Sequence, residues 1–152
     1  TVLLGATSSG LVLTSDTTES TGMKWASPSG VSIDSQISTV GSTTTTSATL
    51  VDTGLTLTCS STVSRVYQIY FTGVYFNNSA QDRTITYSLL INGSVVSTKT
   101  YIQTDTSTAG KHCCAINWNA TIPNGQIVKI QHSVSNGATL TLANATLTIF
   151  GI

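Results

Sequence analysis

Few residues of this chain could do chemistry. The 152 residues include two histidines, three cysteines and six carboxylates, whereas an enzyme needs a nucleophile, a base and an orienting group that converge on one substrate. Cys114 and His132 could form a nucleophile and base pair if their strands were neighbours, but the sequence supplies no third group to orient the histidine. We therefore expect no catalytic residue, no cofactor and no enzymatic activity.

A metal site is poorly supported as well. His112, Cys113 and Cys114 are adjacent, and successive strand residues point to opposite faces, whereas structural zinc sites use ligand pairs about two to four residues apart. A histidine could hold a metal on a three-fold axis, where one side chain becomes three, and His132 is the better candidate for that position. For the chain itself we expect no bound metal.

The three cysteines do not suggest a disulfide framework, because their number is odd and the chain is long for a disulfide-rich domain. Cys113 and Cys114 would point to opposite faces of a strand and are poorly placed to pair with each other. We expect all three to be small buried side chains. The alternative is a bridge from Cys59 to one of the other two.

Charge excludes several classes of partner. Charged residues make up 8% of the chain, six basic and six acidic, against about 25% in an ordinary soluble domain. No basic stripe is available for nucleic acid, and no apolar run approaches the roughly 20 residues of a membrane-spanning helix. The sequence therefore predicts a folded domain with a hydroxyl-rich surface, without nucleic-acid binding or membrane insertion.

Strands are predicted by residues that are apolar at every second position. This alternation runs over residues 85–91, and Asn92-Gly93 then predicts a tight hairpin turn with a returning strand at 94–102. The alternation changes phase near Ala143-Asn144, which predicts a bulge or register change there. Further alternating segments lie at 112–122, 127–134 and 140–149.

These elements predict an all-β fold, an antiparallel two-sheet jelly-roll sandwich with a short extended N-terminal lead-in. Residues 1–30 form the lead-in and residues 31–152 the head domain. Residues 39–49 are rich in threonine and serine and fit either a linker or an extended strand. Trp118 is in phase with apolar neighbours and is expected in the core.

The segment 65–77 is apolar on both faces. One face carries Tyr67, Ile69, Phe71 and Tyr75, and the other carries Val66, Tyr70, Val74 and Phe76. Because an antiparallel strand of this kind must be covered on both sides, a neighbouring subunit is expected on the second face. His112 and His132 are expected in the interior or at an interface. The predicted subunit interface comprises Tyr70, Val74, Phe76, His132 and Phe150.

Two parts of the chain resemble known families. Residues 5–16 (GATSSGLVLTSD) and 21–26 (TGMKWA) resemble a segment found ahead of C-terminal head domains in phage tail proteins and in structural proteins of large DNA viruses. Residues 54–152 resemble the tumour-necrosis-factor and complement globular-head jelly rolls, through YQIYFTGVYF at 67–76, the turn at 92–93 and ATLTIFGI at 145–152. The second resemblance implies an obligate trimer with aromatic side chains along its three-fold axis.

Together the resemblances imply a virion structural protein, the trimeric C-terminal head of a fibre or spike on the virion surface. Its expected partners are two further copies and a host receptor or glycan. One alternative is a secreted glycan- or receptor-binding module of the same fold. A second alternative is a self-cleaving C-terminal trimerisation chaperone, for which Thr1 would be the new N-terminus.

Overall fold

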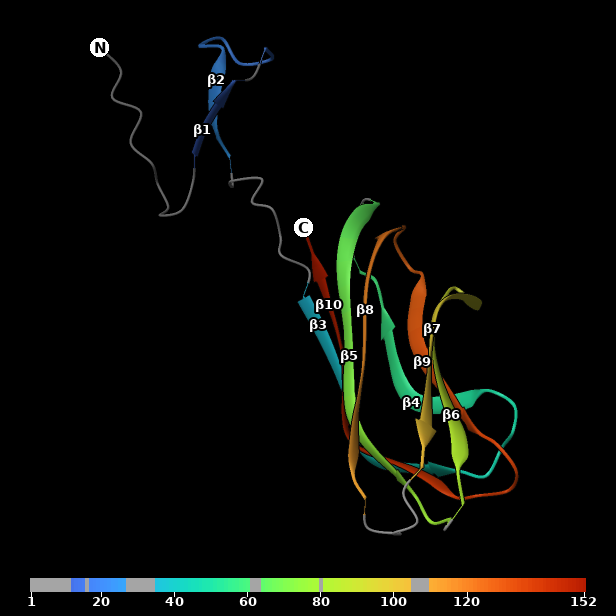
Figure 1. Ribbon diagram of the computed structural model, residues 1–152. Coiled ribbons are helices and arrows are strands. Elements are labelled where there is room, and N and C mark those ends of the chain that lie inside the picture. The colour runs from blue at the N-terminus through green and yellow to red at the C-terminus, as the bar shows by residue number, and fades with distance from the viewer. Residues whose placement is uncertain (1–11, 16, 27–34, 61–63, 80, 105–109) are drawn as a thin grey trace. The chain divides into compact units, whose positions relative to one another are not determined.

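The computed structural model (Figure 1) describes residues 12–15, 17–26, 35–60, 64–79, 81–104 and 110–152. The chain divides into two compact units, residues 1–32 and 33–152. The strands are β1 (Val12–Ser15), β2 (Met23–Ala26), β3 (Ser35–Thr45), β4 (Val51–Thr58), β5 (Arg65–Asn77), β6 (Arg83–Ile91), β7 (Ser94–Gln103), β8 (His112–Ile122), β9 (Ile127–Val134) and β10 (Leu140–Gly151). Within these ranges no helix is long and apolar enough to cross a membrane.

The first unit contains a small antiparallel hairpin in which β1 pairs with β2. Its turn is closed by the Gly22 amide, which donates to the Glu19 carbonyl at 2.9 Å, and Gly22 has a φ of +69°. The segment that was expected to be an extended lead-in thus contains a β-hairpin, which the sequence did not predict. Most of the predicted viral motif at 5–16 lies outside the described residues, apart from 12–15.

The second unit is the antiparallel two-sheet sandwich that the sequence predicts. One sheet has the order β3-β10-β5-β8 and the other the order β4-β9-β6-β7, and the two sheets face each other in Figure 1. Consecutive strands alternate between the sheets except at the β6–β7 hairpin, which is the jelly-roll arrangement. Asn92 and Gly93 in that hairpin both have positive φ, at 49° and 82°, as the predicted turn requires.

The core fills the space between the two inner faces. Every second residue of β5 is buried, from Tyr67 to Tyr75. Its neighbour β10, and β6 and β9 of the facing sheet, contribute further buried aliphatic side chains. The largest fully buried side chains are Tyr67, Tyr87, Phe71, Leu55, Ile69, Ile85, Leu89, Ile122, Ile130, Leu140, Leu142 and Leu147. The period-2 patterns that predicted strands therefore also identified most of the core.

The phase change expected near Ala143-Asn144 is a bulge in β10. The register against β5 shifts between Ala143 and Thr146, and Asn144 takes a φ of 49°. The extra residue lets Leu142 and Ala145 both point inward, although they are three positions apart. This bulge explains the change of parity in the sequence.

One alternative is decided and one expectation is wrong. Residues 35–45 are the edge strand β3, paired with β10, so of the two alternatives for residues 39–49 the extended strand is correct over residues 39–45. Trp118 was expected in the core but is 39% exposed. It shares the inner parity of its partner Ile69, but β8 is an edge strand, where an inward phase does not guarantee burial.

Candidate binding surfaces

The outer face of the β3-β10-β5-β8 sheet carries exposed apolar side chains, and we call it the apolar outer face. Its most exposed members are Ile37 at 63%, Val66 and Tyr70 at 40% each, and Phe150 at 36%. Tyr70 lies beside Thr148 of β10 and Asn117 of β8, and its hydroxyl donates to Gln68 Oε1 at 2.9 Å. Aromatic, aliphatic and hydroxyl side chains alternate here in place of charges.

Four of the five predicted interface residues lie on this face. Tyr70 and Phe150 are exposed, and Val74 and Phe76 are half-buried. His132 does not belong there, because it is fully buried inside the sandwich, on β9 between Val51 and Tyr87. His132 does lie on the same face of its strand as Ile130 and Val134, as the alternation predicts, but that face lines the core and not a subunit interface. A metal held by His132 on a three-fold axis is therefore excluded.

The core becomes polar around His132. Its ring lies 6.2 Å from that of Tyr87, between centroids, and Tyr87 in turn lies beside the Cys114 thiol. Burial raises the pKa of Tyr87 and raises the pKa of Cys114 to about 12, while burial lowers the pKa of His132 to about 4. At neutral pH these groups are therefore uncharged.

The condition for a Cys114–His132 pair is not met, since β8 and β9 are not neighbouring strands, and neither ring nitrogen of His132 has a hydrogen-bond partner among the described residues. Cys114 instead donates its S–H to the Gly73 carbonyl at 3.5 Å. The three cysteines are all thiols, with Cys59 and Cys114 buried and Cys113 exposed, so the expected burial is wrong for Cys113 and the alternative bridge from Cys59 is absent. Among the residues described, no three histidine, cysteine or acidic side chains gather as metal ligands.

A cavity of about 340 Å³ opens on the outer face of the other sheet. It lies where β4, β9 and the β6–β7 turn meet, and we call it the β4–β9 pocket. Its walls combine two charged side chains, two polar ones, two apolar ones and two glycines. They are Asp52, Lys129, Thr56, Asn92, Leu55, Ile127, Gly54 and Gly93.

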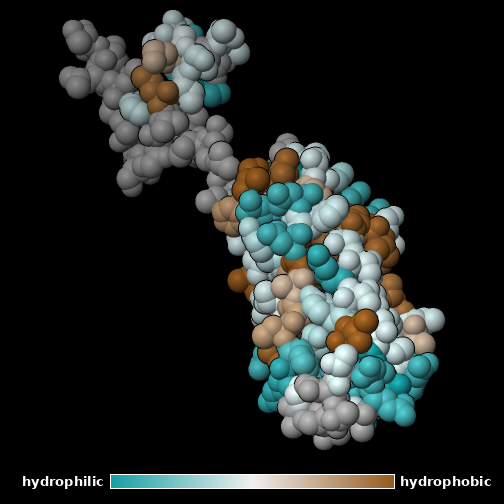
Figure 2. Space-filling view, in the orientation of Figure 1, coloured by the Kyte–Doolittle hydropathy of each residue, from teal (hydrophilic) through white to brown (hydrophobic). Residues whose placement is uncertain are grey.

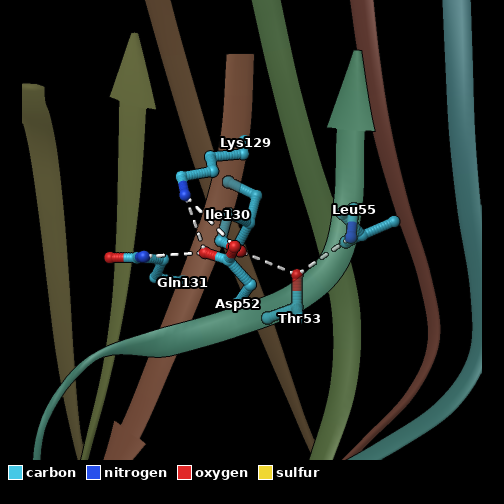
Figure 3. A network of polar contacts seen from close by, with 6 residues as sticks. All are labelled: Asp52, Thr53, Leu55, Lys129, Ile130 and Gln131. Carbon is cyan, nitrogen blue, oxygen red and sulfur yellow. Dashed lines mark hydrogen bonds and ion pairs between the residues drawn. The ribbon is translucent and has the colours of Figure 1, made fainter. Parts of the chain in front are cut away.

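A carboxylate held by two neighbours forms one wall of the pocket (Figure 3). Gln131 Nε2 donates to Asp52 Oδ1 at 2.7 Å, and Lys129 Nζ lies 2.9 Å from Oδ1 and 3.1 Å from Oδ2. The hydrogen bond from Gln131, followed by that from Lys129, lowers the pKa of Asp52. The carboxylate is thus ionised and fixed in direction while its side chain is still 58% exposed.

A bulge in β4 shapes the pocket. The register against β9 shifts between Asp52 and Thr56, and Gly54 takes a φ of +88°, which favours glycine. Figure 3 shows how Thr53 bridges the gap, its hydroxyl donating to the Ile130 carbonyl at 2.8 Å and accepting the Leu55 amide at 3.2 Å. The buried threonine replaces the strand hydrogen bonds that the bulge removes.

Sequence analysis did not identify this pocket. The turn at 92–93 and the strand at 127–134 were both predicted, but Asp52 and Gln131 are 79 residues apart, and no local pattern pairs their strands. The available signal was Gly54 inside a strand of threonines, since a glycine within a strand often marks a bulge.

Comparison with known proteins supports the fold alone. No protein-family description matches the sequence, and no curated protein matches it either. Among solved structures, the chain is similar to Eiger TNF from S. frugiperda, with 12% identity and a TM-score of 0.51 over 79% of this chain and 92% of that one. It is also similar to latent PorU from Porphyromonas gingivalis, with 9% identity and a TM-score of 0.52 over 80% of this chain and 14% of PorU.

These observations define the class of the protein. It is an all-β, two-sheet jelly roll whose fold is similar to that of Eiger TNF, with an uncharged apolar surface on one sheet and a pocket of mixed polar and apolar lining on the other.

Proposed function

We propose that this chain is the trimeric head domain of a fibre or spike on a virion surface, where it holds three chains together and attaches the particle to a host cell. The role is structural and adhesive, without catalysis. The observation that carries trimerisation is the apolar outer face with its exposed Ile37, Tyr70 and Phe150. The virion setting is supported by the resemblance of residues 5–16 and 21–26 to segments of viral structural proteins.

The distribution of charge supports an interface on this face. In the four strands β3, β5, β8 and β10, Arg65 is the one lysine, arginine or acidic residue, and it has the inward parity of Tyr67. Charge depletion combined with exposed aromatic residues is the compositional mark of interface cores. The outer face of the opposite sheet carries the ion pair of Asp52 and Lys129, as a solvated face does.

The character of the apolar outer face also favours a particular kind of partner. The side of the second unit drawn in Figure 2 is mostly pale, with separate hydrophobic patches. A second and third copy provide an identical, uncharged surface without any further partner, and closed symmetry is the usual arrangement of homo-oligomers.

A second candidate is a single-chain receptor-binding module of the same fold. The β4–β9 pocket favours it, because a mixed polar and apolar depression is typical of ligand sites. In that case the apolar outer face would remain open to solvent, and the two candidates therefore differ in oligomeric state.

The test is the absolute mass of the full chain by light scattering during size-exclusion chromatography. Three chains of 15.8 kDa should elute with a mass of about 47 kDa, the product of the two numbers. The double variant Tyr70→Ser, Phe150→Ser should lower the mass toward one chain, because it removes two aromatic contacts of the kind that dominate interfaces.

The matched control is Ile102→Ser, an apolar residue that is 67% exposed on β7 of the opposite sheet. Its mass should stay that of the unsubstituted chain. A single-chain mass for the unsubstituted protein would reject the trimeric head and favour the second candidate. If the double variant still forms a trimer and Ile102→Ser does not, the interface lies on the β4-β9-β6-β7 sheet, and the proposed apolar interface is rejected.

A further inference from the structure

We infer that the β4–β9 pocket binds a neutral saccharide unit, with Asp52 accepting hydrogen bonds from two adjacent sugar hydroxyls. The inference rests on the proposed attachment role and names the chemical class of its receptor. It does not depend on trimerisation, since all lining residues come from one chain.

The carboxylate is prepared for a hydroxyl-rich ligand. Gln131 and Lys129 hold Asp52 from one side, with distances of 2.7 to 3.1 Å, so the carboxylate does not lose side-chain freedom when a ligand arrives. Each carboxylate oxygen can accept more than one hydrogen bond, and the side chain remains 58% exposed. Hydrogen bonds to an ionised acceptor are stronger than those between neutral groups.

Charge balance in the pocket selects a neutral ligand. Asp52 and Lys129 are the two charged residues of its lining, and they neutralise each other at 2.9 Å. A phosphate or carboxylate ligand would have to compete with Asp52 for the single ammonium group. Thr56 and Asn92 add side chains that both donate and accept, which suits hydroxyl groups.

The remaining walls suit the C–H faces of a sugar ring. Ile127 is 45% exposed, and the buried Leu55 also lines the pocket. Gly54 and Gly93 have no side chain, and a Cβ at Gly93 would meet nothing within 4 Å, so a ligand can approach the backbone there. The Asn92 amide donates to the Ile127 carbonyl at 2.8 Å, which fixes the turn against β9.

The pocket stays accessible when the apolar outer face is covered. It opens on the outer face of β4-β9-β6-β7, whereas the apolar face belongs to the other sheet. A trimer would therefore present three copies to solvent. Three weak sites on one particle head would bind a glycan-coated surface far more strongly than one, through their effective concentration.

The test is a titration of the ¹⁵N-labelled full chain with methyl glycosides of glucose, galactose, mannose and N-acetylglucosamine, followed by amide chemical shifts. N-acetylneuraminic acid serves as the anionic probe. We expect at least one neutral glycoside to shift the amides of Gly54, Gly93 and Lys129 saturably, with no such shift from the anionic sugar. Asp52→Asn should weaken binding about tenfold through loss of the charged acceptor.

The control is Asp82→Asn, which removes an exposed carboxylate from the loop before β6 and should leave binding unchanged. The inference is overturned if no neutral glycoside shifts these amides, if the anionic sugar binds as tightly, or if Asp52→Asn binds as well as the unsubstituted chain. Light scattering on the same samples separates the two proposals. A trimer without sugar binding removes the saccharide site alone, whereas sugar binding by a single chain removes the trimeric head alone.

Discussion

Burial of His132 should make the fold sensitive to acid. The side chain is fully buried, neither ring nitrogen has a hydrogen-bond partner among the described residues, and the Tyr87 ring lies 6.2 Å away. Burial lowers the pKa of His132 from 6.5 to about 4, because a buried site disfavours the charged imidazolium. The folded protein therefore holds His132 neutral, while the unfolded chain can protonate it.

The sign and size of the effect follow from this difference in pKa. Between about pH 6.5 and pH 4 the unfolded state binds a proton that the folded state does not, so the free energy of unfolding falls as pH decreases through this window. Above about pH 6.5 the neutral histidine contributes its full stabilisation, and below about pH 4 the free energy of unfolding loses no more from this group. At about pH 4.5 the loss from His132 should be about 2.5 kcal/mol.

The assay is urea unfolding followed by tryptophan fluorescence at about pH 7.5 and pH 4.5, with protein concentration fixed because an oligomer unfolds in a concentration-dependent way. His132→Gln cannot titrate and should lose about 2.5 kcal/mol less than the unsubstituted chain between the two conditions. His112→Gln, at the other histidine, is the matched control. Equal losses for the unsubstituted chain and His132→Gln would refute the argument.

Two substitutions test the bulges that shape the sheets. Gly73→Ala should destabilise the fold by about 1–3 kcal/mol, since the new Cβ would lie 2.7 Å from Leu142 Cδ1. The control is Gly41→Ala, where a Cβ meets nothing within 4 Å and stability should change little. Similar melting temperatures for the two variants would contradict this prediction. Thr53→Val should cost about 1–3 kcal/mol in urea unfolding, because it leaves the buried Ile130 carbonyl without the hydroxyl that bonds it at 2.8 Å. An unchanged stability for that variant would mean that the β4 bulge needs no side-chain bridge.

Local patterns were enough to predict the sandwich strands from β5 to β10, whereas β3 was left open between strand and linker and β4 was not singled out. The strand predicted at 127–134 has the same bounds as β9, because a half-buried strand must place apolar side chains at every second position. The phase change at Ala143 located the bulge in β10 for the same reason. Hairpin turns with asparagine and glycine are equally local, since both residues tolerate positive φ.

Parity cannot tell which side of a sheet is the core. His132 shares a face with Ile130, and the sequence fits either a core face or a subunit interface; the structure places it in the core. Edge position is also hidden, which is why Trp118 was expected inside and is exposed. Both errors have one cause, because burial depends on the neighbouring strands, and strand order is not a local property of the sequence.

The same non-local strand pairing gives the two outer faces different character, one with an ion pair and the other uncharged and apolar. Asp52 and Lys129 come together on one sheet only because β4 pairs with β9, while the apolar outer face gathers Tyr70 and Phe150 from β5 and β10. Association through an uncharged face would depend on apolar burial and shape, which salt does not screen as it screens ion pairs. In the proposed trimer, the subunits would associate through one sheet, and the loops and turns of the other sheet would be free to vary.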